Sequence, residues 1–179
     1  MTMSETVEVA TKTAAPVNTG MPLPLERFYF WEKNHPNKVC FTQPMGEGEV
    51  VHITWGEAAK QVRRVAAYLM AQGVKHGDRV AILSKNCAHW IMSDIAIWMA
   101  GGVSVPIYPT SSAETIEQIL HHSGSKALFV GKLDGWESMK PGVPETLKCI
   151  SYPLSPQNDY DTWSDICAST EPLAGSPRR

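Results

Sequence analysis

Short apolar runs alternate with helical stretches between Arg79 and Val130, and this alternation constrains the fold more than any other feature. The runs Arg79–Leu83, Val103–Ile107 and Ala127–Val130 are too short for helices and suit buried strands. Strands separated by helices run parallel, with the helices covering both faces of the sheet. We therefore expect an α/β fold with a mainly parallel sheet flanked by helices. Pro106 predicts an edge or irregular position, because proline cannot donate to a strand ladder.

A β-hairpin is expected before this α/β region. Residues 39–42 and 50–53 are rich in strand-forming residues, and Gly46-Glu47-Gly48 separates them. The first helix follows directly, because Thr54 and Glu57 form a capping box and apolar residues recur behind it at helical spacing. Gly73 ends this helix.

The later elements are predicted from caps and stop signals. Asn86 or Ser84 is expected to cap an apolar helix that reaches residue 100, and Ser111 with Glu114 forms a second capping box before a helix that ends at Gly124. A fourth strand is expected within 147–152, a short helix within 136–144 and a final short helix at 162–168.

The domain organisation follows from where this periodicity begins and ends. Residues 1–20 are interpreted as a disordered tail, 21–168 as one folded unit and 169–179 as an unstructured tail. The longest uncharged stretch, 95–113, is interrupted by glycines and prolines and is not the span of about 20 apolar residues that a membrane crossing needs.

Composition excludes several classes of protein. Hydrophobic residues make up 43% of the 179 residues and charged residues 19%, which is ordinary for a soluble domain. The 16 basic and 18 acidic residues lack the positive excess that nucleic-acid binding requires. The four cysteines show no paired spacing for zinc or redox chemistry, so a reducing cytoplasm is the default location.

Candidate ligand contacts follow from the fold class. Ligands of parallel α/β sheets bind beyond the carboxyl ends of the strands, which nominates 84–86, 108–112 and 131–132. A dinucleotide or phosphate loop is not expected, because Gly46-x-Gly48 lacks a third glycine and Gly131-Lys132 lacks the remainder of that motif.

Two groups containing histidine are interpreted as structural. Cys87 and His89 lie two residues apart on a predicted helix and point in different directions, so they do not form a nucleophile and base pair there. His121 and His122 also diverge, and a solvated helix end explains them better than a metal site. No metal ligand and no catalytic residue is predicted.

Charged residues on two helices have both a structural and a functional interpretation. Asp94 lies within an apolar helix and must find a partner or reach water, so a structural role is favoured over an active-site role. Lys60, Arg63 and Arg64 form a basic face that is interpreted as solvated.

Three segments in order resemble one known family. They are 52–55 (HITW), 73–82 (GVKHGDRVAI) and 99–110 (MAGGVSVPIYPT). The order resembles the N-terminal part of the AMP-forming acyl-CoA synthetases, in the adenylate-forming superfamily. The stretch 108–112 with Ala113, Glu114 and Ile116 is similar to the long-chain fatty acid branch. The resemblance covers about residues 22–168.

The resemblance implies an enzyme that joins a fatty acid to ATP as an acyl-adenylate and then passes the acyl group to coenzyme A. ATP, magnesium and coenzyme A are the implied cofactors of the full-length enzyme. The family's Pro-Lys-Gly phosphate loop, its magnesium ligand and its catalytic lysine lie downstream of the matching region and are not in this sequence. We therefore expect an N-terminal fragment that is inactive alone and binds none of these cofactors by itself.

The substrate-binding prediction is the loop that contains Tyr108, Thr110 and Ser111, as part of the wall of an acyl or coenzyme A cavity. The competing interpretation is a loop that only caps the next helix. Two other classes stay open: a stand-alone module that binds an acyl or nucleotide ligand, and a non-catalytic interaction protein. A cytoplasmic location is expected, while peripheral membrane contact and self-association through uncovered apolar surface stay open.

Overall fold

The structure is a computed structural model of the chain, and it describes residues 22–177. The predicted tail at 1–20 lies outside the described residues. The elements are α1 (Pro24–Asn34), β1 (Val39–Gly46), β2 (Glu49–Thr54), α2 (Trp55–Ala71), β3 (Arg79–Leu83), α3 (Ala88–Met99), β4 (Val103–Ile107), α4 (Ala113–Ser123), β5 (Ala127–Val130), α5 (Trp136–Met139), the 3₁₀ turn η1 (Lys140–Gly142), β6 (Lys148–Ser151), β7 (Asp161–Thr162) and α6 (Trp163–Ser169).

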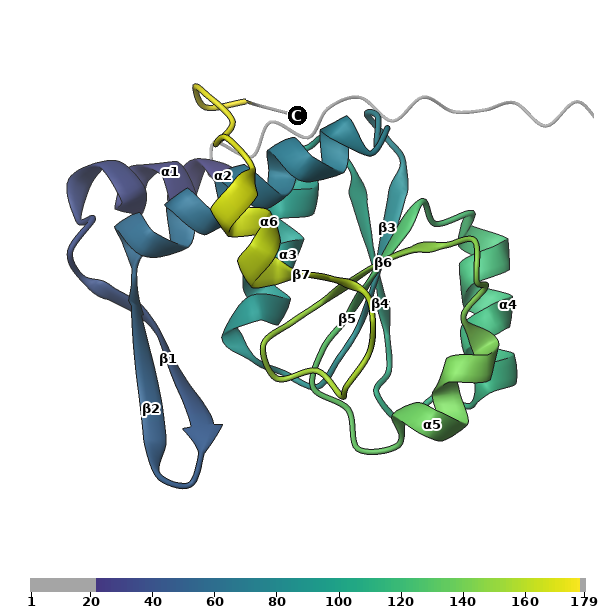
Figure 1. Cartoon of the computed structure of the whole chain (residues 1–179). Helices are drawn as coiled ribbons and strands as arrows, with labels where there is room; N and C mark the ends of the chain where they lie inside the picture. The colour runs from purple at the N-terminus through teal and green to yellow at the C-terminus, as the bar shows by residue number, and fades with distance from the viewer. Residues whose placement is uncertain (1–21, 178–179) are drawn as a thin grey trace, which may run out of the picture.

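A five-stranded parallel sheet forms the centre of the molecule, with strand order β4-β3-β5-β6-β7 (Figure 1). The prediction of a mainly parallel sheet flanked by helices is confirmed. Pro106 lies on β4, an edge strand, where its missing N–H is tolerated, as predicted.

Side chains alternate between the two faces of the sheet along each strand. Val80 and Ile82 belong to the core packed by α2, α3 and α6, whereas Ala81 and Leu83 belong to the core packed by α4 and α5. Figure 1 shows these two groups of helices on opposite sides of the strands. Because both faces are covered, the central strand β5 is apolar throughout and β3 is apolar after Arg79.

The hairpin of β1 and β2 is antiparallel, as predicted, and extends away from the sheet (Figure 1). Its base is fixed by Gln43, whose Oε1 accepts a hydrogen bond from the backbone N–H of Ala88 at 2.8 Å. This contact corrects a prediction, because neither Asn86 nor Ser84 caps α3. The N-cap is Cys87, which makes no side-chain cap bond.

Two further predictions of helix starts need correction. Ser112, not Ser111, caps α4, since its Oγ accepts from the backbone N–H of Thr115 at 3.2 Å. Helix α1 was not predicted at all. Its N-cap is Leu23, which lacks a capping side chain. The signs of the start are Pro24 at the first helical position and Glu26, whose carboxylate accepts from the Leu23 N–H at 3.1 Å.

The interpretation of Arg63 as part of a solvated face is wrong. Its side chain is 14% exposed and forms a bidentate ion pair with Glu32, at 2.8 and 2.7 Å. The same guanidinium donates to the carbonyl oxygens of Leu173, at 3.2 Å, and Gly175. Residues 170–177 contain no helix or strand, yet Arg63 holds them against α1 and α2.

Candidate ligand-binding site

Three loops follow the carboxyl ends of β3, β4 and β5, and they match the three nominated segments. The loops after β3 and β5 lead to helices on opposite faces of the sheet, which is the arrangement that opens a crevice in many α/β proteins. Here that crevice is closed. Lys85 N–H donates to the Lys132 carbonyl at 2.8 Å, and Lys132 N–H donates to Ser84 Oγ at 3.0 Å.

Gly131 explains how the two loops come this close. A Cβ at this position would overlap the side chains of Ser84 and Tyr152. Residues 131–132 therefore complete the packing between β3 and β5, and Lys132 projects away from it as an exposed side chain. The structure does not bring the predicted segment 131–132 into a cavity with the loop after β4.

A cavity of about 340 Å³ instead lies between the ends of β3 and β4. It is lined by Ser84, Asn86, Trp90, Pro106, Ile107, Tyr108 and Pro109. Two of the three nominated segments, 84–86 and 108–112, thus contribute to one site. Its volume is at the lower end of the range for small-molecule pockets, about 300–1,000 Å³.

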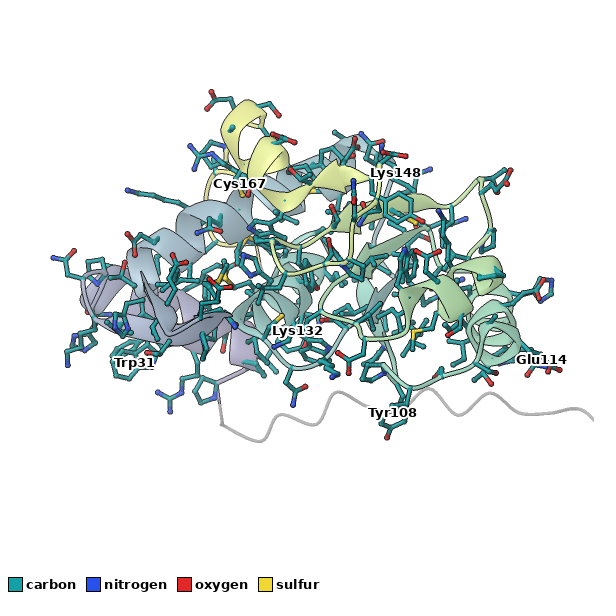
Figure 2. The ribbon with its side chains drawn as sticks, turned by 60° about the horizontal axis from the view of Figure 1, so that its bottom comes forward. Trp31, Tyr108, Glu114, Lys132, Lys148 and Cys167 are labelled. Carbon is teal, nitrogen blue, oxygen red and sulfur yellow. The ribbon has the colours of Figure 1, made fainter. Side chains whose placement is uncertain are left out.

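The three predicted substrate-binding residues have different positions. Tyr108 lines this cavity and is 81% exposed, and Figure 2 shows it projecting from the body of the protein. Thr110 and Ser111 do not line it. The backbone N–H of Ser111 donates to the carbonyl of Tyr108 at 3.0 Å, which folds the loop into a turn.

Sequence reasoning missed Trp90 as a lining residue. Trp90 is half-buried at the start of α3, four residues after Asn86, and it was interpreted only as part of an apolar helix. A signal was available, because Asn86 was already nominated and lies just before the first turn of the helix that carries Trp90.

The lining of the cavity decides what it can offer to a ligand. None of its lining side chains is charged, so it offers shape, an aromatic pair and neutral hydrogen-bonding groups. The nearest charged side chain in the loop after β3 is Lys85, which is paired with Asp134. Among residues 22–177, no cluster of three histidine, cysteine or acidic side chains is placed to hold a metal ion.

His89 and Cys87 have separate surroundings in the structure. The His89 ring is buried against Tyr152 and Trp163, with ring centroids 5.7 and 5.3 Å away, and burial lowers its pKa to about 4. Cys87 Sγ lies 3.9 Å from Ser84 Oγ. Among the described residues, no hydrogen bond joins these two side chains.

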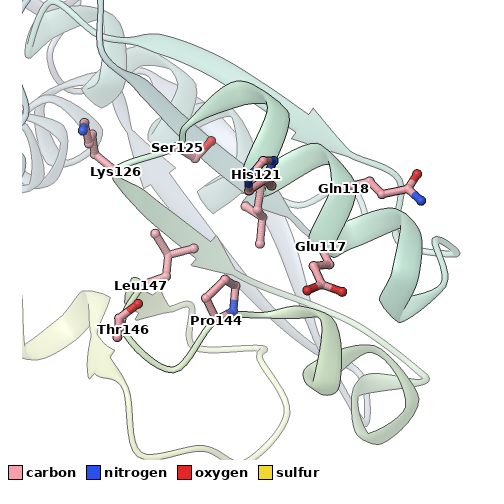
Figure 3. Close-up of a pocket in the computed structure, with 9 residues that line it drawn as sticks. Glu117, Gln118, His121, Ser125, Lys126, Pro144, Thr146 and Leu147 are labelled. Carbon is pink, nitrogen blue, oxygen red and sulfur yellow. The ribbon is translucent and has the colours of Figure 1, made fainter.

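A second cavity, of about 580 Å³, lies at the opposite end of the sheet, beside the start of β5 (Figure 3). His121 lines it from the last turn of α4, with Glu117 on the same helix face. Pro144 and Leu147 contribute from the segment before β6. It is remote from the carboxyl ends of the strands, so it is not the predicted site.

The fold and the cavity together define a class of protein, the parallel α/β domains with a ligand-sized cavity at the carboxyl ends of their strands. The family model described as AMP-binding enzyme matches residues 28–172. The chain therefore belongs to the AMP-binding enzyme family. This finding agrees with the resemblance found in the sequence.

Curated relatives narrow the comparison to acyl-CoA ligases. The long-chain-fatty-acid–CoA ligase FadD15 of Mycobacterium bovis is 34% identical over 145 residues, which cover 79% of this chain and 24% of the ligase. Fatty acyl-CoA synthetase A of Dictyostelium discoideum is 32% identical over 120 residues, covering 66% of this chain and 18% of that protein. The chain thus spans about a quarter or less of the length of these relatives.

Solved structures support the fold. Acetoacetyl-CoA synthetase from Streptomyces lividans superposes with a TM-score of 0.72 at 22% identity, covering 86% of this chain and 26% of that one. A benzoate CoA ligase from Burkholderia xenovorans gives a TM-score of 0.68 at 17% identity, covering 85% of this chain and 29% of that one. At these identities the likeness is one of fold.

Proposed function

We propose that this chain is the opening part of the acyl-activating domain of an AMP-forming long-chain fatty acid–CoA ligase. The observation that carries the proposal is the in-order match over 145 residues, at 34% identity, with a long-chain ligase. The long-chain pattern at 108–112 supports the same substrate class. The complete enzyme converts a fatty acid, ATP and coenzyme A into acyl-CoA, AMP and diphosphate.

Within such an enzyme, we assign the loop with Tyr108, Thr110 and Ser111 to the wall of the acyl or coenzyme A cavity. Tyr108 and Trp90 supply aromatic surface, and Asn86 and Ser84 supply neutral polar groups. ATP and magnesium bring the activating chemistry, since the metal ion neutralises phosphate charge. This cavity has no charged side chain for that purpose, so its contribution is to position a neutral part of a substrate.

We also propose that the 179 residues do not catalyse ligation alone. The Pro-Lys-Gly loop and the lysine that the family uses are not in this sequence. The test is ATP–pyrophosphate exchange with palmitate on the purified chain, and the expected result is no exchange above a protein-free blank. Exchange that depends on palmitate would overturn the proposal of inactivity.

A second test addresses the proposed parent enzyme. The nucleotide sequence that follows the codon for Arg179 should continue in frame into a glycine-rich loop that ends in Pro-Lys-Gly. An in-frame stop codon at that point would argue against a ligase and for the stand-alone alternative below.

One relative favours a second candidate function, a stand-alone module that binds an acyl or nucleotide ligand. A protein of Mycobacterium tuberculosis with the printed name "Uncharacterized protein" is 30% identical over 116 residues, which cover 64% of this chain and 65% of that protein. The family region thus also occurs in a relative of which this chain spans most of the length.

Ligand binding without turnover would distinguish this stand-alone module from the N-terminal part of a ligase. Calorimetric titration with coenzyme A or palmitoyl-CoA should show saturable binding that Tyr108→Ala weakens. The control is Val103→Ala, which removes an exposed apolar side chain at the other end of β4, away from the loop that carries Tyr108. Absence of binding to both ligands, or equal effects of the two variants, would exclude the module at this cavity.

The proposed location is the cytoplasm. Within the described residues, none of the helices could cross a bilayer. Peripheral membrane contact and self-association stay predictions, for which exposed Val50 and Val51 on the hairpin offer apolar surface. Vesicle flotation and analytical ultracentrifugation of the chain test them.

A further inference from the structure

A separate cavity of about 450 Å³ lies between α1, α3 and the base of the hairpin. It is distinct from the cavity at Tyr108, and no residue lines both. Helix α1 contributes Pro24, Arg27, Phe28 and Trp31, which recur at the spacing of one helix face. One complete face of α1 is thus directed at this cavity.

Helix α3 presents a matching face from the opposite side. Ile91, Asp94, Ile95 and Trp98 follow the same spacing and line the same cavity. Asp94 is the only charged residue of α3, and it lies between apolar neighbours above and below it on this face. A carboxylate in this position is unfavourable unless a partner offsets its loss of hydration.

The partner that Asp94 has is a neutral one. The Ser104 hydroxyl on β4 donates to Asp94 Oδ1. Among residues 22–177, no lysine, arginine or histidine forms an ion pair with this carboxylate. Arg27, the one basic residue that lines the cavity, is exposed. Burial raises the pKa of Asp94 and the Ser104 hydrogen bond opposes that rise, as expected for a carboxyl group without a counter-charge.

Aromatic rings supply much of the remaining wall. Trp55 stacks on Trp31 with ring centroids 5.5 Å apart and planes inclined by 16°, and Phe41 adds a ring from β1. The ammonium of Lys38 lies 6.0 Å from the centroid of Trp31. The aromatic group therefore already attracts one cation, because Lys38 lies over the ring of Trp31 and ring faces carry negative potential.

We propose that this cavity is a binding site for an organic cation, an ammonium group that carries an alkyl or aryl body. The body would contact the apolar faces of α1 and α3, and the ammonium would lie against the tryptophan rings and the Asp94 carboxylate. Aromatic walls with one carboxylate are the surroundings in which proteins bind such cations. The proposal is independent of the ligase reaction.

The test uses the isotope-labelled chain and its tryptophan indole signals in an NMR titration with phenyltrimethylammonium. Among the six tryptophans of the chain, Trp31, Trp55 and Trp98 line the cavity. Their indole signals should shift saturably, and those of the other three should not. Shifts spread over all six signals, or no saturable shift, would overturn the proposal.

Asp94→Asn supplies the matched variant, because an amide oxygen can still accept from Ser104. It should weaken binding of the cation about tenfold, the effect expected when a partly desolvated cation loses its counter-charge. Asp159→Asn, an exposed carboxylate in a loop outside the cavity, should leave binding unchanged. Equal weakening by both variants would show non-specific charge attraction and would overturn the site.

Two further measurements keep the result interpretable. The neutral isostere tert-butylbenzene should bind the original chain more weakly than the cation does. Its own affinity should be the same for the original chain and for Asp94→Asn. Ser104→Ala keeps the carboxylate and removes only its hydrogen-bond donor, so it should retain cation binding, and a loss of binding in this variant would contradict the role of Asp94 as the counter-charge. Tighter binding of the neutral compound to the original chain would contradict the assignment of Asp94.

Discussion

The two faces of the sheet use alternate residues of the same strands but are packed in different ways. On the α3 face, which is covered by α2, α3 and α6, Phe129, Tyr152 and Trp163 form a cluster of rings with His89. On the α4 face, which is covered by α4 and α5, the core is mainly aliphatic, with Ile116 and Leu120 against β3 and β5.

Polar atoms show the same difference. On the α3 face, Tyr152 Oη donates to Ser93 Oγ at 2.6 Å, and Trp163 Nε1 donates to Gln61 Oε1 at 2.8 Å. On the α4 face, the buried Nε1 of Trp136 has no hydrogen-bond partner among the described residues. The α3 face therefore depends on specific geometry, whereas the α4 face depends mainly on apolar burial.

The largest expected effect on the free energy of unfolding comes from replacing one buried side chain on each face with alanine. Trp163→Ala should lower the free energy of unfolding by about 4 kcal/mol, because the indole is 1% exposed and its removal leaves a large void. Leu120→Ala on the α4 face should cost about 3 kcal/mol. Urea denaturation measures both values. A smaller loss for Trp163 than for Leu120 would contradict the ranking.

Acid should weaken the α3 face through His89. Its folded-state pKa of about 4 lies below the ordinary value of 6.5, so between these values the unfolded chain binds a proton that the folded chain does not. The free energy of unfolding should therefore fall as the pH drops from about 6.5 to 4, by about 3 kcal/mol in total. Denaturation at a series of pH values measures this slope.

The control for this slope is His89→Gln, which cannot titrate. Its unfolding free energy should be nearly flat between pH 6.5 and 5, whatever its absolute stability. Asp161, whose pKa is lowered chiefly by Lys148, loses its contribution only as the pH falls below the ordinary carboxyl range. An unchanged slope in the glutamine variant would assign the acid sensitivity elsewhere.

A smaller effect on stability is expected where the backbone of η1 lies close to the backbone of α4. A Cβ on Gly142 would overlap the backbone of Ala113, so Gly142→Ala should cost about 2 kcal/mol by forcing η1 away from α4. Gly135→Ala is the matched control, because its Cβ would meet atoms no closer than 3.4 Å. Thermal unfolding should rank the two variants in this order, and a neutral Gly142→Ala would show that η1 moves freely.

The smallest expected effect on stability comes from removing the indole N–H of one buried tryptophan on each face. Trp163→Phe should cost about 1 kcal/mol, since it leaves Gln61 without its donor. Trp136→Phe removes a buried donor that has no partner, so it should cost less than Trp163→Phe, although both lose ring volume. Equal losses in the two variants would remove the distinction between the faces.

The sequence predicted the elements whose signals are local. The strands from Arg79 onward and the helix after Thr54 follow from runs of neighbouring residues and from a cap three residues away. Helix α1 was missed because Leu23 offers no capping side chain. The start of α3 was misassigned because its partner, Gln43, lies 45 residues earlier in the chain.

The candidate site shows the same division. The strand ends nominated 84–86 and 108–112, and the structure joins them in one cavity. The segment 131–132 was nominated by the same rule, but close packing of Gly131 against Ser84 and Tyr152 closes that crevice. The cavity at Asp94 depends on how α1 packs beside α3, which no local pattern encodes.

The contacts of Arg63 join three parts of the chain that leave the ribosome at different times. Its partner Glu32 lies 31 residues earlier, so the pair can form as soon as α2 leaves the ribosome. The carbonyl of Leu173 lies 110 residues later and emerges only after β3 to β6. In the folded chain, Glu32 neutralises and orients the guanidinium, so the C-terminal segment meets a donor that is already held in place.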